Sequence, residues 1–352
     1  MKRLSMPRGL PALGSLQGYV GLALVLLLGI VTKGDVFLSE ANLTDSVGAF
    51  ASRGILAIGV TLVIITGGID LSVGSLLGIC SMTSAMLLVD HGMSPWEILP
   101  LSMIVGAFFG FLNGVGTTWL RIQSFVMTLA MLSIVRGLDR QLSDNVSVGT
   151  QVIGPDGKTS AESEAFANFG TPGNNVLEGF PFMPDGIYYP VLALVVATVV
   201  FHLILSRTKF GRHVYAVGGN PTAARLSGVN VTMVTIAVFT LSGMLAGFAG
   251  PIDAAYSASA DPQAGSSYEL DAIAAAVIGG ASLAGGRGTI IGTLVGALIL
   301  TLLDNVLGLN AVSDNWQLVI KGLIVVVAVV LQRPGFFSGL LTPFKKLKGE
   351  QS

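Results

Sequence analysis

Long runs of hydrophobic residues, interrupted by short polar stretches, dominate this chain. A bilayer core about 30 Å thick takes roughly 20 helical residues to cross, and on that measure we predict about ten spans. The apolar runs are continuous and do not alternate with period two, which favours helices over a transmembrane barrel. The approximate limits are 17–32, 46–66, 73–89, 97–118, 124–142, 188–206, 231–252, 268–280, 289–308 and 315–332.

Composition places these helices in a membrane. Hydrophobic residues make up 52% of the 352 residues and charged residues only 11%, and the mean hydropathy is +0.76. The 46 glycines suit helices that pack closely in lipid. We therefore predict an all-α integral membrane protein in which residues 1–352 form a single transmembrane domain. The eighth span, 268–280, carries two carboxylates and is short enough to be partial or tilted.

The basic residues set the predicted orientation. With a cytoplasmic N-terminus, most of the 19 Lys and Arg fall in inside segments, as the positive-inside rule expects. Both termini are then cytoplasmic. The polar segment 143–187 lies outside, and a loop of that length is either functional or mobile. It is expected to dock an external partner or to be a mobile loop without a specific task.

A paired glycine and an aspartate interrupt the apolar sequence "VIITGGIDLSVGSLLG", residues 63–78. Gly67 and Gly68 free the backbone to turn, and Asp70 can accept hydrogen bonds from the first amides of the next helix, at Ser72 or Val73. Asp70 and Ser72 can also line a polar path, because ionisable groups at membrane depth tend to face a cavity. A similar pattern recurs at 279–286, "GGASLAGG". We expect both segments on the cytoplasmic side, and a duplicated half is one explanation.

The most basic loop is 207–231, "RTKFGRHVYAVGGNPTAARLSGVNV". Asn220 is a good N-cap, Pro221 suits the first helical position and Gly228 suits the left-handed position that ends a helix. The stretch between them makes about two turns, or near 10 Å, and is too short to span a bilayer. We expect either a rigid capped helix that fits a groove on a soluble partner or a surface helix that only links two spans.

Polar residues within the spans are candidates for a substrate pathway. Interhelical hydrogen bonding would account for the neutral ones. Lys321 would pair with Asp271 or Asp304, or extend toward the membrane surface. The predicted pathway residues are Thr61, Asp70, Ser72, Asn113, Asp271, Asn305 and Lys321.

The sequence gives no sign of catalysis. It holds no Walker A pattern, nucleophile elbow, HExxH motif or paired carboxylates in a soluble pocket. We predict no catalytic residues, no metal site and no nucleic-acid partner, and we expect Cys80 to be a packed small side chain. If transport is driven by ATP, another polypeptide must hydrolyse it.

Four ordered segments carry a resemblance to a known family. They are "TLVIITGGIDLSVGSLLG", "AVGGNPTAARLSGVNV", "ELDAIAAAVIGGASLAGGRGTIIGTLVGALI" and "WQLVIKGLIVVVAVVLQ". Between about residue 45 and 332 the chain closely resembles the membrane permease subunits of ribose-type ABC importers. The resemblance implies the permease fold of the ribose, branched-chain amino acid and vitamin B12 importers, in a bacterial inner membrane.

The family implies partners as well as a fold. Two permease subunits, identical or paralogous, work as a pair with a cytoplasmic ATPase that binds ATP and Mg, and a periplasmic protein delivers the sugar. The segment matching 218–231 contacts the ATPase in that family. The matching residues here are Gly219, Asn220, Pro221, Ala223, Ala224, Arg225, Leu226, Gly228 and Val229; relatives often have Ile where this chain has Val229.

Two other functions compete with sugar import by an ABC permease. An ion-coupled secondary transporter would use Asp70, Asp271 and Lys321 as a relay, but it does not explain the coupling-like loop. An ABC permease for branched-chain amino acids has related segments, although the "GGIDLSVGS" sequence favours a sugar.

Overall fold

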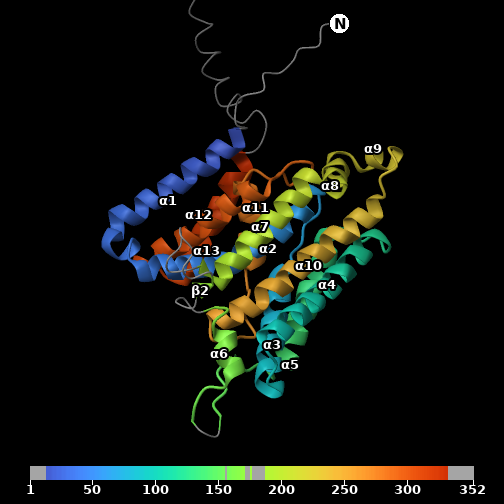
Figure 1. Ribbon diagram of the computed structural model, residues 1–352. Coiled ribbons are helices and arrows are strands. Elements are labelled where there is room, and N and C mark those ends of the chain that lie inside the picture. The colour runs from blue at the N-terminus through green and yellow to red at the C-terminus, as the bar shows by residue number, and fades with distance from the viewer. Residues whose placement is uncertain (1–12, 155–156, 171–174, 177–186, 332–352) are drawn as a thin grey trace, which may run out of the picture.

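The computed structural model describes residues 13–154, 157–170, 175–176 and 187–331. Within these ranges it is almost entirely helical (Figure 1). The helices are α1 (Leu13–Phe37), α2 (Glu40–Ile65), α3 (Val73–His91), α4 (Pro95–Thr118), α5 (Ser124–Leu142), α6 (Ala161–Ala167), α7 (Tyr189–Arg207), α8 (Lys209–Gly219), α9 (Pro221–Leu226), α10 (Val231–Tyr256), α11 (Tyr268–Ile278), α12 (Ile290–Leu309) and α13 (Asp314–Leu331). The short strands are β1 (Val148–Gly149), β2 (Asn175–Val176), β3 (Ile187–Tyr188) and β4 (Ser259–Ala260).

Each predicted span coincides with one of these helices. Seven helices of the described chain are long and apolar enough to cross a membrane: α1, α2, α3, α4, α7, α10 and α12. The eighth predicted span is α11, whose 11 residues reach about 16 Å, half of a bilayer core. Helix α5 carries Arg136, Asp139 and Arg140. The sequence did not predict α6 and α8.

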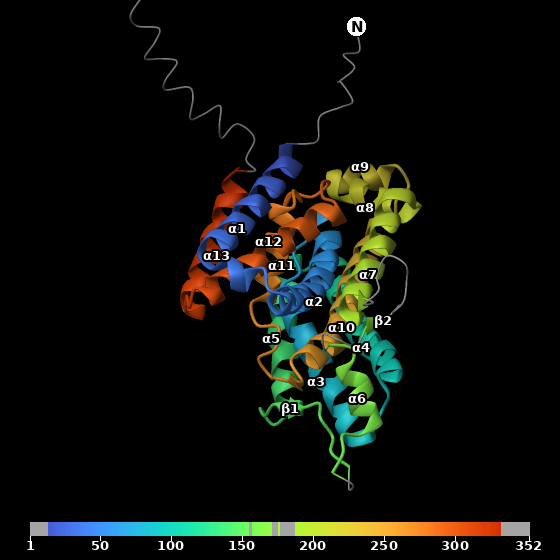
Figure 2. The same cartoon turned by 60° about the vertical axis from the view of Figure 1, so that its left-hand side comes forward.

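Helix α2 lies at the centre of the bundle. It is packed by α7, α10, α11 and α12, and α3 lies against α10 (Figures 1 and 2). In its most apolar stretch 83% of the residues are buried. Because α2 is surrounded on all sides, it carries apolar residues around its whole circumference, and Ile55, Leu62 and Ile64 are fully buried. Helix α2 therefore forms the centre of the core.

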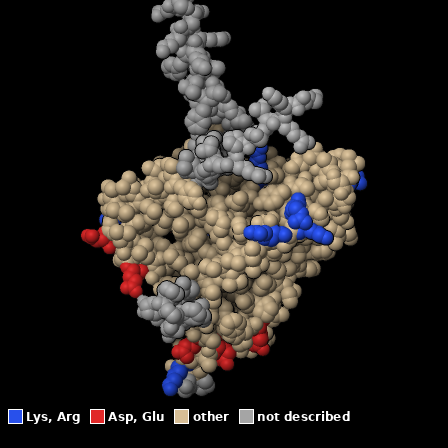
Figure 3. Space-filling view, turned by 45° about the horizontal axis from the view of Figure 1, so that its top comes forward, with Lys and Arg blue, Asp and Glu red and all other residues tan. Residues whose placement is uncertain are grey.

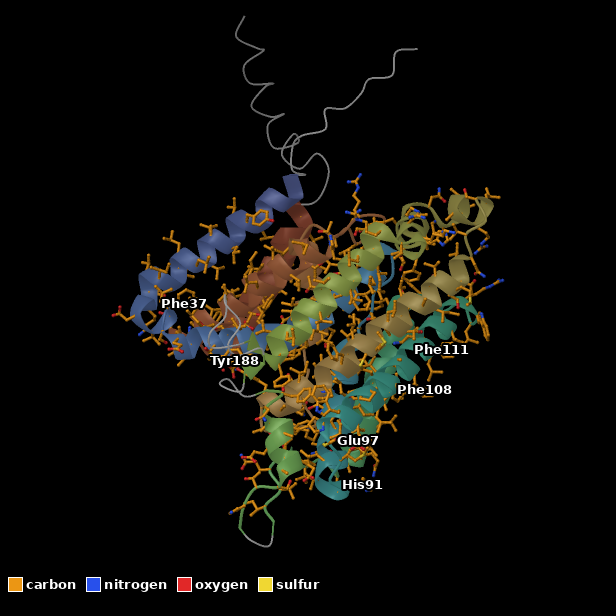
Figure 4. The ribbon with its side chains drawn as sticks, viewed as in Figure 1. Phe37, His91, Glu97, Phe108, Phe111 and Tyr188 are labelled. Atoms are coloured by element: carbon orange, nitrogen blue, oxygen red, sulfur yellow. The ribbon has the colours of Figure 1, made fainter. Side chains whose placement is uncertain are left out.

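Helices α4 and α10 approach closely through glycine. A methyl group added at Gly106 or Gly110 of α4 would overlap the backbone of α10 at Gly243 or Phe239. The Ser102 hydroxyl also donates to the Gly247 carbonyl at 2.8 Å. Small residues allow such contact between helices in lipid. The other face of α4 holds Phe108 and Phe111, 55% and 44% exposed, along the outer side of the bundle (Figure 4).

Two non-helical segments, 66–72 and 257–267, interrupt the bundle. The second leaves α10, pairs with β1 through β4, and returns to the interior, where Gly265 lies against Gly74 of α3. The Arg136 guanidinium donates to the carbonyls of Pro262 and Ala264 at 3.0 and 2.7 Å. Irregular backbone at membrane depth is tolerated where protein satisfies its polar groups, and these bonds do so.

The described part of segment 143–187 is packed against the bundle. Phe166 and Phe169 are buried with Leu88, Ile98 and the end of α10. The Phe169 ring meets Trp96 edge-on at 5.2 Å and stacks on Tyr189 at 5.1 Å. These residues therefore cap one end of the bundle; partner docking and mobility both stay predictions for this segment, and its other residues lie outside the described ones.

The two ends of the bundle differ in charge. Helices α8 and α9 and the start of α1 lie at one end, and α6 lies at the other (Figures 1 and 2). Figure 3 shows several Lys and Arg side chains at the α8 end and several Asp and Glu side chains toward the α6 end. This polarity agrees with the predicted orientation. The two termini themselves, 1–12 and 332–352, lie outside the described residues, and their cytoplasmic location stays a prediction.

Candidate functional site

The predicted short helix between α8 and α10 is present as α9. The Asn220 side chain caps it by accepting from the Ala223 amide at 2.9 Å, and Pro221 occupies the first turn. Gly228 has φ +85°, a left-handed value that ends a helix at little cost in glycine. The three capping predictions are therefore confirmed, and α9 is a separate capped helix of six residues.

Helix α9 projects from the bundle (Figure 1). Arg225 is exposed, and Leu226 is 86% exposed. Ala224 faces inward at 5%, and its carbonyl accepts from the Val229 amide at 3.0 Å. An exposed leucine beside an exposed arginine at the tip of a capped helix has the form of a docking element for another protein.

Helix α8 joins α9 to the bundle. Its Thr208 N-cap accepts from the Gly211 amide at 3.2 Å, and Val214 and Val217 are buried. The Tyr215 hydroxyl donates to the Gly288 carbonyl at 2.8 Å, and burial raises the pKa of this phenol, so it stays a protonated donor. Helix α8 therefore attaches α9 to the bundle through buried side chains and the Tyr215 hydrogen bond.

Asp70 lies deep in the bundle and is fully buried. One carboxylate oxygen accepts from the Ser72 amide at 3.0 Å and the Ser72 hydroxyl at 2.7 Å, and the other accepts from the Ser242 hydroxyl at 2.9 Å. The bond to the Ser72 amide confirms the predicted role at the start of α3. Ser242 is about 16 Å along α10 from Val231, so Asp70 is enclosed by the bundle; that the segment faces the cytoplasmic side stays a prediction.

Neighbouring helices satisfy the rest of the 66–72 segment. The Asn113 amide of α4 donates to the Ser72 hydroxyl at 2.8 Å. On α5, Ser124 accepts from the Ile69 amide at 3.2 Å and Thr128 accepts from the Leu71 amide at 3.1 Å. Side chains of α4, α5 and α10 therefore bond to this break and tie it to the helices around it.

The resemblance between 67–74 and 279–286 does not extend to equivalent backbone positions. Both preceding helices end in the same motif, in which the Gly68 amide bonds the Val63 carbonyl and the Ala281 amide bonds the Ala276 carbonyl. The residue with a left-handed backbone is Gly67 in the first segment and Gly280 in the second. The sequence pattern instead aligns Gly67 with Gly279, so the structural and sequence matches differ by one position.

A second polar group joins four helices by ion pairs. Lys321 of α13 lies 3.0 Å from Asp271 of α11 and 2.9 Å from Asp304 of α12. Arg53 of α2 lies 2.6 Å from Asp304 and over the Tyr268 ring at 5.1 Å. Two cations therefore balance two carboxylates, all at most 23% exposed. Of the alternatives for Lys321, the structure shows pairing, and with both carboxylates.

The predicted pathway residues fall into separate groups. Asp70, Ser72 and Asn113 are together, while Thr61 of α2 pairs with Thr293 of α12 at 2.7 Å. Asp271 and Lys321 are in the ion-pair group, and Asn305 exchanges amide hydrogen bonds with Asn42 at 2.7 and 3.1 Å. A small cavity beside the ion pairs is lined by Arg53, Tyr268, Asp271 and Thr301, among others.

Sequence reasoning missed Arg53 as a site residue, although it lay in the predicted span 46–66. A charged residue at membrane depth is itself a signal of function. The same holds for Asp139 of α5, which is fully buried and 3.6 Å from Arg136. Within the described ranges, no cluster of His, Cys, Asp and Glu could hold a metal ion. Cys80 is free and buried.

Comparison with known proteins identifies the family. The model of a family described as branched-chain amino acid transport system / permease component matches residues 42–329. The ribose import permease protein RbsC of Escherichia coli K12 is 39% identical over 311 residues, which cover 88% of this chain and 91% of that protein. This chain belongs to the family of ABC importer permeases.

Other relatives agree in coverage. RbsC of Bacillus subtilis is 39% identical over 310 residues, covering 88% of this chain and 89% of its own. The xylose transport system permease protein XylH of Haemophilus influenzae is 34% identical over 358 residues, covering 90% and 96%. No solved structure matches this chain. Since family members are permease components, ATP is hydrolysed by a separate subunit and this chain is not an enzyme.

Proposed function

We propose that this chain is the membrane subunit through which an ATP-driven importer moves a monosaccharide across the bacterial inner membrane. The ribose and xylose permeases are similar over nearly their whole length, and a galactose/methyl galactoside permease is 33% identical over 327 residues. Branched-chain amino acid transport, which the family description names, is the second candidate. The sugar proposal is favoured because these similar proteins all carry sugar names.

The observation that supports ATP coupling is α9. Its capped ends, exposed Arg225 and exposed Leu226 suit a groove on a cytoplasmic ATPase. We assign Gly219, Asn220, Pro221, Ala223, Ala224, Arg225, Leu226, Gly228 and Val229 to this contact. ATP and Mg would be held by that partner, and no cofactor is proposed for this chain.

Two further partners follow from this assignment. A periplasmic sugar-binding protein would dock at the opposite end, where α6 and the β1–β4 pair lie. A second permease subunit, identical or paralogous, would form the passage together with this bundle. Opening would alternate between the two ends as ATP binds and is hydrolysed.

The interior polar groups would have different tasks. Asp271, Asn305 and Lys321 are partly exposed and are the stronger candidates to line a path. Thr61, Asp70, Ser72 and Asn113 are fully buried with partners, so we assign them first to holding the break and the packing of α2. An ion relay through Asp70 and Lys321 is disfavoured because their bonded partners belong to separate groups.

Sugar uptake with two inhibitors tests the proposal. Cells that express the chain with its genomic ATPase and binding protein are given labelled ribose, xylose, galactose and leucine in turn. Uptake of one sugar that stops on ATP depletion and survives a protonophore at constant ATP would support it. Leucine uptake would favour the second candidate, and uptake that collapses with the ion gradient at constant ATP would contradict ATP coupling.

A further inference from the structure

Helix α2 ends at a carbonyl that its own helix cannot satisfy. In a continuous helix the Ile65 carbonyl would accept from the Ile69 amide, but that amide bonds to Ser124 on α5. The Ile65 oxygen instead accepts from the Gly286 amide, in the turn between α11 and α12, at 2.8 Å. Because the helix breaks after Ile65, the Ile65 carbonyl is free to accept a hydrogen bond from the α11–α12 turn.

Helix α8 closes over the same oxygen. Gly218 lies so near that a methyl group there would overlap the Ile65 carbonyl and come within 2.6 Å of the Gly286 amide nitrogen. Gly285 is also close, since a methyl group on it would lie 2.8 Å from the Gly218 carbonyl and 3.0 Å from the Gly67 amide. Three segments distant in sequence therefore meet at one atom, and only glycine fits there.

This junction joins α9 to both interior polar groups. On one side, Ile65 leads through Gly67 to Asp70; on the other, the 285–286 turn leads into α12, which carries Asp304. Tyr215 of α8 also reaches this turn directly, because its hydroxyl donates to the Gly288 carbonyl. Close-packed backbone with no intervening side chain transmits displacement, because packed interiors have low compressibility.

We propose that Gly218 is the positioning residue that transmits movement of α8 and α9 to the α2–α3 break and to the α11–α12 turn. Its task differs from that of Arg225, since Gly218 faces the bundle and not the partner. The inference rests on the proposed function, because the movement would be driven by the ATPase that docks on α9.

The first test measures transport per ATP hydrolysed in proteoliposomes that hold the complete importer. Gly218→Ala should retain the ATPase but lower sugar moved per ATP by about tenfold, a typical coupling between sites. Gly308→Ala is the control, because Gly308 is an exposed helical glycine with open space around it. An unchanged ratio in a folded Gly218→Ala complex would overturn the inference alone. An ATPase that never binds the wild type would overturn the proposed function.

The second test needs no change at Gly218. Spin labels are placed in pairs on three exposed positions: Arg212 of α8, Arg287 of the α11–α12 turn, and Arg121 of the loop between α4 and α5. The only cysteine of the sequence, Cys80, is buried and does not compete for label. On ATP binding the 212–287 distance should stay constant while the 212–121 distance changes. A change in 212–287 of equal size, or no change in either pair, would overturn the inference even if Gly218→Ala does not fold.

Discussion

The Asn113 side chain donates to the Ser72 hydroxyl at 2.8 Å, although the two residues are 41 positions apart. Ser72 in turn donates to Asp70, which also accepts from Ser242. One buried chain of hydrogen bonds therefore ties α4, the break and α10 together. Buried networks of this kind can be worth more than the sum of their separate bonds, and Asp70 accepts three of these bonds, which makes it sensitive to change.

Replacement of Asp70 by alanine should destabilise the protein. It would leave the Ser72 amide and the Ser72 and Ser242 hydroxyls without their acceptor, and an unsatisfied buried group costs about 1–3 kcal/mol. We expect lower yield and earlier thermal unfolding in detergent. Asp70→Asn keeps one acceptor oxygen and should unfold near the wild-type temperature.

Transport by the folded Asp70→Asn protein separates two roles for this side chain. Uptake close to wild type would fit a structural acceptor. A large loss of uptake with unchanged unfolding would instead place the carboxylate charge in the sugar path. Asp70→Ala that unfolds like the wild type would contradict the structural role.

Lys321 and Asp271 should be energetically coupled. Removing Lys321 alone leaves Asp271 without its nearest cation, while Arg53 still serves Asp304. Residues in one ion-pair network show interaction energies of about 0.5–3 kcal/mol, so Lys321→Met should cost more stability than Lys321→Met combined with Asp271→Asn. Unfolding in mixed micelles measures all four members of the cycle, and strictly additive effects would show that the pair contributes nothing.

The Asn220 cap should matter for partner binding. Loss of an N-cap costs about 1 kcal/mol of helix stability, which corresponds to roughly fivefold in affinity if α9 must be helical to dock. Asn220→Ala should therefore weaken ATPase binding in a titration of the purified subunits, and Asn220→Asp should restore it. Equal weakening by both variants would show that the amide itself contacts the partner.

The main features of the fold could be predicted from the sequence because hydrophobic length and capping residues act locally. The helices at the ten predicted spans and α9 follow from such signals, since Asn220, Pro221 and Gly228 each act within a few residues. Helix α8 was not predicted, because its apolar residues, such as Val214 and Val217, lie among the basic residues of a segment that reads as a loop. The shortness of α11, which has 11 residues, could be predicted because the apolar stretch at 268–280 is itself short.

What the sequence could not supply is the set of long-range partners. Nothing local tells that Ser242 faces Asp70, that Asn42 pairs with Asn305 or that Gly218 closes over Ile65. These contacts depend on how broken helices return into the bundle. The partners that enclose Asp70 could not be predicted for the same reason, because a Gly-Gly turn predicts a change of direction but not where the chain then goes.

The most direct test of the account is copurification from the native membrane. The tagged protein is solubilised gently, and bound proteins are identified by mass spectrometry, in parallel with Arg225→Glu and with Lys33→Glu, an exposed charge reversal on α1. We predict a stoichiometric ABC ATPase with the wild type and Lys33→Glu, and its loss with Arg225→Glu while membrane insertion is unchanged. Recovery of the ATPase in equal amounts with Arg225→Glu, or no ATPase with the wild type, would contradict coupling through α9.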